Sequence, residues 1–241
     1  MKKIAFTLPE ILITIGIIGI IAALTIPNII TNFQKRITIT RLKDVYSIFQ
    51  QAIRLSEQDN GGIDAWDYTL DTDAWVEKYL IGYLKLSKNA KFYQQLNMWK
   101  LLDGSLLNWG SGEYTRPIYA LHNGVWVSFY LNYYNDGNPQ NFRKSGVWIL
   151  VDINGNKGPN RMGRDVFVMS IYPYKYPDEK VVMGAHEQCG SGIIHRSMTR
   201  EQLLNSGCAT CKEDKTGWGF ACSRLIQIDG WQISNEYPWI K

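Results

Sequence analysis

Residues 2–27 read KKIAFTLPEILITIGIIGIIAALTIP, and this stretch decides how the rest of the chain is interpreted. Two lysines precede a small residue, Ala5, and an apolar run without a charged residue covers positions 11–26. A secretory signal peptide should end its apolar run at a small-residue cleavage site, followed by unrelated mature sequence. Here the small residue precedes the run, and amphipathic sequence follows it. We therefore favour a membrane anchor or an assembly helix over a signal peptide.

Glu10 separates these two alternatives. An isolated carboxylate costs about 2.5–3.5 kcal/mol at the centre of a bilayer, and less near an interface. A plain anchor has no reason to carry such a residue. The order of a basic leader, a small residue, Phe, Thr, Leu, any residue, Glu and an apolar helix is typical of one superfamily. The stretch resembles the N-terminus of type IV pilins and type II secretion pseudopilins.

That resemblance implies several roles for individual residues. A prepilin peptidase would cut between Ala5 and Phe6 and methylate the new amino group of Phe6. Glu10 would pair with the N-terminal ammonium of a neighbouring subunit, which offsets the cost of the lone charge and fixes the axial register between subunits. Gly19 and Pro27 fall where pilin helices commonly loosen in the filament. The divisions expected are a leader at 1–5, a transmembrane and assembly helix at 6–30, and an extracytoplasmic pilin-like globular domain at 31–241.

The charges give a first expectation of location and partners. Lys2 and Lys3 before the apolar run place the N-terminus in the cytoplasm by the positive-inside rule. The chain is then expected in a bacterial inner membrane as a single-pass protein, and later in a periplasmic or surface filament. Expected partners are other pilin or pseudopilin subunits, the prepilin peptidase, the inner-membrane assembly platform and the lipid bilayer. The net charge is +4, and +2 without the two leader lysines, so nucleic acid is not expected as a partner.

The helix is predicted to continue beyond the membrane. A kink is expected at Pro27, because proline removes one backbone hydrogen bond. Apolar residues then recur every three to five positions on an otherwise charged helix, and this stripe predicts packing against a globular domain. Asn60-Gly61-Gly62 should end the helix. The stripe comprises Phe33, Ile37, Leu42, Val45, Phe49 and Ile53.

The remaining sequence predicts an α+β fold, with the long N-terminal helix packed on an antiparallel β-sheet as in pilins. Residues 63–96 are predicted as a helical connection in which Asp71 or Asp73 caps a helix. Asp-Gly and Asn-Gly pairs between apolar runs indicate β-hairpins. The expected hairpins cover 98–109, 118–131 and 225–233, and a further strand pair joins 147–151 with 166–171.

The loop at 151–165, VDINGNKGPNRMGRD, is a candidate calcium site. Oxygen-bearing side chains crowd a glycine-rich turn, as a hard cation requires. The loop does not match an EF-hand, because Lys157 stands at the sixth position and Gly163 where a bidentate Glu is needed. A loop held by Asx turns and glycines without metal is the alternative. Pseudopilin-like subunits often bind calcium in such a loop. The candidate ligands are Asp152, Asn154, Asn156, Asn160 and Asp165.

Four cysteines, Cys189, Cys208, Cys211 and Cys222, form the second candidate constellation. In an exported domain they most simply form two disulfides, for which three connectivities exist. We favour Cys189 with Cys208 and Cys211 with Cys222, as staples of the C-terminal region onto the sheet. Zinc would normally need a second Cys-x-x-Cys pair, and a thioredoxin-like role would need a βαβ unit.

The sequence does not predict an enzyme. His122, His186 and His195 form no metal-spaced pair, and no Gly-x-Ser-x-Gly, Walker or HExxH motif occurs. The expected function is a structural pilin or pseudopilin subunit that polymerises through its N-terminal helix. The alternative is a membrane-tethered extracytoplasmic binding or hydrolytic domain exported with a pilin-like signal. A minor pilin for DNA uptake is a third option, which the low net charge disfavours.

Overall fold

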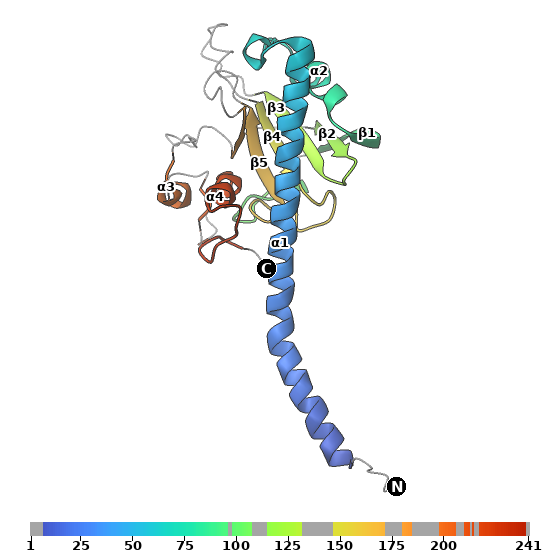
Figure 1. Ribbon diagram of the computed structural model, residues 1–241, viewed down its shortest axis with the longest axis vertical. Coiled ribbons are helices and arrows are strands. Elements are labelled where there is room, and N and C mark those ends of the chain that lie inside the picture. Colours follow the sequence, from blue (N-terminus) through green and yellow to red (C-terminus); the bar gives the residue numbers. More distant parts are fainter. Residues whose placement is uncertain are drawn as a thin grey trace.

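The fold consists of one very long helix and an antiparallel sheet (Figure 1). The computed structural model describes residues 7–95, 98–107, 115–131, 147–171, 180–184, 198–205, 210–212, 214 and 217–239. The predicted α+β class, with a long N-terminal helix on an antiparallel sheet, is confirmed.

Helix α1 runs from Leu8 to Asn60 without interruption. Its start is stabilised by Glu10, whose Oε2 accepts hydrogen bonds from the backbone N–H and the hydroxyl of Thr7, both at 2.7 Å. Pro27 lies inside the helix, and α1 bends in its lower, blue half (Figure 1). The helix ends where Gly61 takes a φ of 78°, a left-handed value that favours glycine. The predicted end at Asn60-Gly61-Gly62 is therefore correct.

Six described strands form the sheet in the order β1-β2-β3-β4-β5-β6, and every neighbouring pair is antiparallel. The hairpin at 118–131 and the strand pair around the 151–165 loop form as predicted. The strands are β1 (Leu86–Gln95), β2 (Thr115–Leu121), β3 (Trp126–Leu131), β4 (Val147–Asp152), β5 (Val166–Ile171) and β6 (Val181–Met183).

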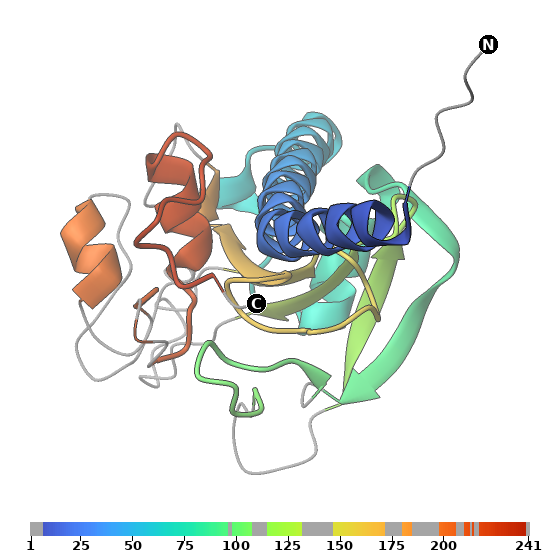
Figure 2. The same cartoon turned by 90° about the horizontal axis from the view of Figure 1, so that it is seen from below.

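The shorter helices precede and follow the six strands in the sequence. Helix α2 (Thr72–Tyr79) begins at Asp71, whose Oδ1 accepts from the N–H of Ala74 at 2.9 Å, so Asp71 is the cap of the two candidates. The 3-10 turns η1 (Ile63–Ala65) and η2 (Ile81–Tyr83) flank α2. Helices α3 (Arg200–Asn205) and α4 (Cys222–Ile228) lie in the C-terminal region. Seen from below, α1 crosses one face of the sheet and α4 lies beside it (Figure 2).

The core lies between α1 and the sheet. Leu42, Val45, Phe49 and Ile53 are fully buried, as the apolar stripe predicted. The ring of Phe49 meets Phe129 of β3 edge to face, with centroids 5.9 Å apart. The first two stripe positions were assigned wrongly, because Phe33 is 63% exposed and Ile37 is 37% exposed. The sheet does not extend far enough toward the N-terminus of α1 to cover them, and Thr38 is the first buried residue of the helix.

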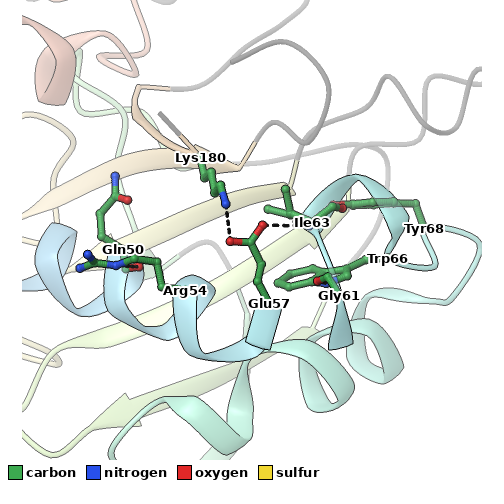
Figure 3. A network of polar contacts seen from close by, with 8 residues as sticks. All are labelled: Gln50, Arg54, Glu57, Gly61, Ile63, Trp66, Tyr68 and Lys180. Carbon is green, nitrogen blue, oxygen red and sulfur yellow. Dashed lines mark hydrogen bonds and ion pairs between the residues drawn. The ribbon is translucent and has the colours of Figure 1, made fainter. Parts of the chain in front are cut away.

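Glu57 fixes the far end of α1 to the domain (Figure 3). Its Oε1 accepts from the N–H of Ile63 at 3.0 Å, and its Oε2 forms an ion pair with Lys180 beside β6. The adjoining turn is held by the indole of Trp66, which donates to the carbonyl oxygen of Gly61 at 2.8 Å. The hydroxyl of Tyr68 donates to the carbonyl oxygen of Ile63 at 2.9 Å. The helix is thereby attached to an edge of the sheet.

Two local predictions were wrong, and a third is confirmed over its described residues. Residues 86–95 form strand β1 rather than part of a helical connection. The hairpin expected at 225–233 is helix α4 followed by a turn, because Gly230, with a φ of 73°, follows the helix end instead of joining two strands. The hairpin predicted at 98–109 forms over its described residues, 98–107: the N–H of Leu107 donates to the carbonyl oxygen of Trp99 and the N–H of Leu101 to that of Ser105, both at 2.8 Å, with one antiparallel bridge between Lys100 and Leu106.

Candidate functional site

The N-terminal half of α1 is an exposed apolar surface. Every Leu, Ile and Phe from Leu8 to Phe33 is between 42% and 74% exposed. Monomeric soluble proteins rarely expose contiguous apolar patches larger than a few hundred Å². Residues 8–30 extend about 34 Å at about 1.5 Å per residue, close to the hydrocarbon thickness of about 30 Å. By length and composition, α1 is the one helix among the described residues that can cross a membrane.

The predicted assembly residues lie along this exposed half. Glu10 is on its first turn, and its carboxylate points toward the N-terminal side, where it accepts from Thr7. Gly19 is a helical position with open space around it, since a Cβ there would meet nothing within 4 Å. Pro27 continues the same surface toward the domain. The predicted cleavage residues Ala5 and Phe6 lie outside the described residues.

The 151–165 loop brings part of the predicted calcium set together. Asp152 is fully buried and Asp165 is 3% exposed. Asn154 joins them, because its N–H donates to Oδ1 of Asp152 at 3.2 Å and its Nδ2 donates to Oδ2 of Asp165 at 3.2 Å. Burial raises the pKa of Asp152 to about 8, and nearby Asp165 adds to the rise. Burial also raises the pKa of Asp165.

The hydrogen bonds of these carboxylates brace the loop. Asp165 also accepts from the backbone N–H groups of Asn160 and Arg161, at 2.9 and 2.7 Å. Asp152 accepts from the indole of Trp99 at 2.9 Å. Asn156 is exposed, and the amide oxygens of Asn154 and Asn160 are buried without a hydrogen-bond partner among the described residues.

The same loop connects three parts of the domain. Arg161 donates from Nε and Nη2 to the carbonyl oxygen of Leu102, which fixes the 98–107 turn. Arg164 donates to Oε1 of Gln34 on α1 at 2.8 Å. The buried hydroxyl of Tyr237 donates to the carbonyl oxygen of Gly163 at 2.6 Å. Gly163 has a φ of 75°, and a Cβ there would lie 2.9 Å from the Sγ of Cys222, so this position requires glycine.

The cysteine prediction is confirmed where the structure describes it. Cys211 and Cys222 form a disulfide. Its place in the fold differs from the prediction, because it joins two segments of the C-terminal region and does not cross to the sheet. The region docks instead through α4, where the hydroxyl of Ser223 donates to the carbonyl oxygen of Val168 at 2.7 Å. Cys189 and Cys208 lie outside the described residues.

One pocket and the histidines bear on the alternative of a hydrolytic or ligand-binding domain. A pocket of about 580 Å³ lies between α3 and the C-terminal segment, and Glu236, one of its carboxylates, pairs with Arg200. Within the described ranges, no three or more His, Cys, Asp or Glu side chains gather as a metal site. His122 is exposed, and His186 and His195 lie outside those ranges. The pocket is lined by Leu204, Asn205, Lys212, Asp214 and Glu236.

Sequence reasoning missed the residues that gather where α1 leaves the domain. Arg164 and Lys35 both lie over the ring of Trp239, at 4.2 and 5.9 Å from its centroid. Lys43 lies 5.6 Å from the centroid of Trp231. One signal in the sequence was available: four basic residues follow the apolar run within positions 35–43. The two tryptophans are far away in the sequence, so their part in this surface needed the fold.

Together, fold and site define an α+β domain carried on a helix whose N-terminal half is apolar and uncovered. Residues 28–240 match the family described as "Family of unknown function (DUF6613)", and the chain belongs to that family. The match covers the domain and the last part of the exposed helix, and it begins after the apolar run. No curated protein and no solved structure matches the chain.

Proposed function

We propose that the protein is a structural subunit of a type IV pilus or type II secretion filament, processed by a prepilin peptidase and polymerised through the N-terminal half of α1. The observation that carries this proposal is the exposed apolar surface of residues 8–33 with one carboxylate, Glu10, on its first turn. Burial of apolar area at about 25 cal/mol per Å² favours packing of several such helices together.

The position of Glu10 suits the charge pairing that the resemblance implies. Its carboxylate already accepts from the N–H of Thr7, so it lies near the amino group that a cut before Phe6 would create. Pairing with the corresponding ammonium of a neighbouring subunit would neutralise the carboxylate of Glu10. This is the one charged side chain of the helix half that enters the filament core. The pairing would also fix the axial position of one helix against the next.

The disulfide supports an extracytoplasmic domain. Disulfides persist in oxidising compartments and are rare in the cytosol, so Cys211–Cys222 favours export of the domain. Counting charges does not set this orientation alone, because two lysines precede the apolar run and four basic residues follow it. The proposed orientation, with the N-terminus in the cytoplasm, rests on the prepilin-like motif and on the disulfide.

Two experiments test this function in cells that supply a prepilin peptidase and an assembly platform. Mass spectrometry of the mature protein should find N-methyl-phenylalanine at Phe6. Glu10→Ala should be cut, and it should be stable because the side chain of Glu10 hydrogen-bonds to Thr7 and not to the domain. It should be absent from sheared filaments, because it lacks the carboxylate for the charge pair. Asp44→Ala removes an exposed carboxylate from the domain half of α1 and should assemble normally. An unprocessed N-terminus, or normal filaments from Glu10→Ala, would refute the proposal.

A further inference from the structure

Two basic side chains and one indole gather where α1 leaves the domain. Arg164 bonds to Gln34, so its guanidinium lies at the level of that turn of α1, and it shares the ring of Trp239 with Lys35. Arg36 is exposed on the same turn. The C-terminal segment, drawn in dark red, meets α1 at the lower edge of the domain (Figure 1). We call Lys35, Arg36, Arg164 and Trp239 the collar.

The collar lies directly beyond the apolar half of the helix. Lys35 follows Ile30 by five residues, which places it about 7.5 Å farther along the axis. The headgroup layer on each side of a bilayer is about 5–8 Å thick, because the hydrocarbon core is about 30 Å of a total of about 40–45 Å. When residues 8–30 span the membrane, the collar therefore lies at headgroup depth. Lys and Arg favour this depth with their apolar stems inward and their charged ends toward water, and Trp is enriched at it.

Within the collar, the side chain of Arg36 is exposed, whereas those of Lys35 and Arg164 are half-buried. Arg164 also lies near the buried carboxylate of Asp165. Farther along the helix, Arg41 is engaged by the domain, since its Nη1 donates to the carbonyl oxygen of Ile153 at 2.9 Å. Lys35 and Arg36, together with the half-buried Arg164, place three basic residues on the membrane side of the domain. Basic residues so close to a span are disfavoured on the exported side, which calls for a compensating interaction.

We propose that the collar binds the headgroups of anionic phospholipids in the leaflet beneath the domain. The inference rests on the membrane-inserted stage of the proposed function and adds a lipid partner to it. Arg and Lys hydrogen-bond phosphate oxygens, and Trp239 holds two of the three cations at one level. Lipid contact there fixes the depth of α1 and keeps the domain on the bilayer until assembly.

The test uses the full chain in nanodiscs of phosphatidylcholine with and without 30% phosphatidylglycerol, where native mass spectrometry counts the lipids retained after release. The collar variant is Lys35→Gln with Arg36→Gln. The control, Lys85→Gln with Lys88→Gln, removes the same charge from exposed positions just after Tyr83, whose hydroxyl accepts from Asn60 at the opposite end of α1. A carbonate wash of each nanodisc precursor membrane measures insertion separately.

We expect preferential retention of phosphatidylglycerol by the original chain and by the control. The preference should fall about fivefold for each collar cation removed, and it should weaken in high salt. Equal preferences in the collar and control variants would overturn the inference while leaving insertion, and hence the proposed function, intact. A chain that the carbonate wash extracts would instead refute the membrane stage itself. A collar variant that keeps its lipid preference but loses assembly would assign these cations to a neighbouring subunit, and would also overturn the inference.

Discussion

The division of α1 into a buried and an uncovered half predicts that the same substitution, Phe to Ala, lowers domain stability in one half and leaves it unchanged in the other. Phe49 is fully buried against Phe129, and Phe33 is 63% exposed on the same helix. Truncating a buried Phe to Ala costs about 3–5 kcal/mol, because apolar contacts are lost and a cavity is left. Surface substitutions away from special features stay within about 0.5 kcal/mol. Phe49→Ala should therefore remove much of a domain stability that is typically about 5–15 kcal/mol, while Phe33→Ala should leave it unchanged.

The assay is urea unfolding of the full chain in detergent micelles, followed by near-UV circular dichroism as a probe of tertiary packing. With a denaturant slope of about 2 kcal/mol per M, Phe49→Ala should lower the midpoint by about 2 M and Phe33→Ala by less than about 0.3 M. Both variants lose the same side chain from the same helix, so intrinsic helix propensity cancels in the comparison. Equal midpoint shifts, or a loss below about 1 kcal/mol for Phe49→Ala, would refute the assignment of the domain core to this half of α1.

Three further predictions concern the loop and the C-terminal region. Burial raises the folded-state pKa of Asp152 to about 8, above its value in the unfolded chain, so the folded state holds its proton longer and stability should fall as the pH rises from about 4 to 8. Asp152→Asn should flatten that slope in urea midpoints measured across this range, and an unchanged slope would show that another group causes it. Replacing both Cys211 and Cys222 by Ala should cost about 3 kcal/mol for a loop of this length, read from the same urea midpoint, and a loss below about 1 kcal/mol would contradict a stabilising role for the disulfide. Because Asp152 and Asp165 already accept N–H groups, 1 mM Ca²⁺ should shift the thermal midpoint no more than EDTA does, and a calcium-dependent rise would instead support the predicted calcium site.

The sequence predicted the elements whose signals are local. The apolar stripe of Leu42, Val45, Phe49 and Ile53 has helical periodicity, and Asn123-Gly124 supplies the left-handed geometry of a tight hairpin, with a φ of 82° at Gly124. These features depend on neighbouring residues alone, so the sequence predicts them correctly without knowledge of the tertiary structure. The extent of the stripe could not be predicted, because the exposure of Phe33 depends on where the sheet ends and not on the helix.

A sequence pattern that is compatible with both a strand and a helix was assigned wrongly. The run at 225–228 followed by Asp229-Gly230 suits both a hairpin and a helix end, and short apolar runs do not distinguish strand from helix by periodicity. Packing of α4 on β5 and the disulfide at Cys222 decide for the helix. The collar could not be predicted from the sequence, for a different reason. Trp239 and Lys35 are about 200 positions apart, and only the path of the C-terminal segment brings them together.

The way α1 is fastened to the domain has a mechanical consequence. Its contacts with the domain are spread over residues 34–60, about 39 Å of helix at about 1.5 Å per residue, and the ion pair of Glu57 with Lys180 lies near the end farthest from the exposed half. A force that pulls on the N-terminal half along the helix axis is therefore shared by all these contacts in shear, instead of peeling them apart one by one. This arrangement suits a domain that is pulled along the axis of its helix.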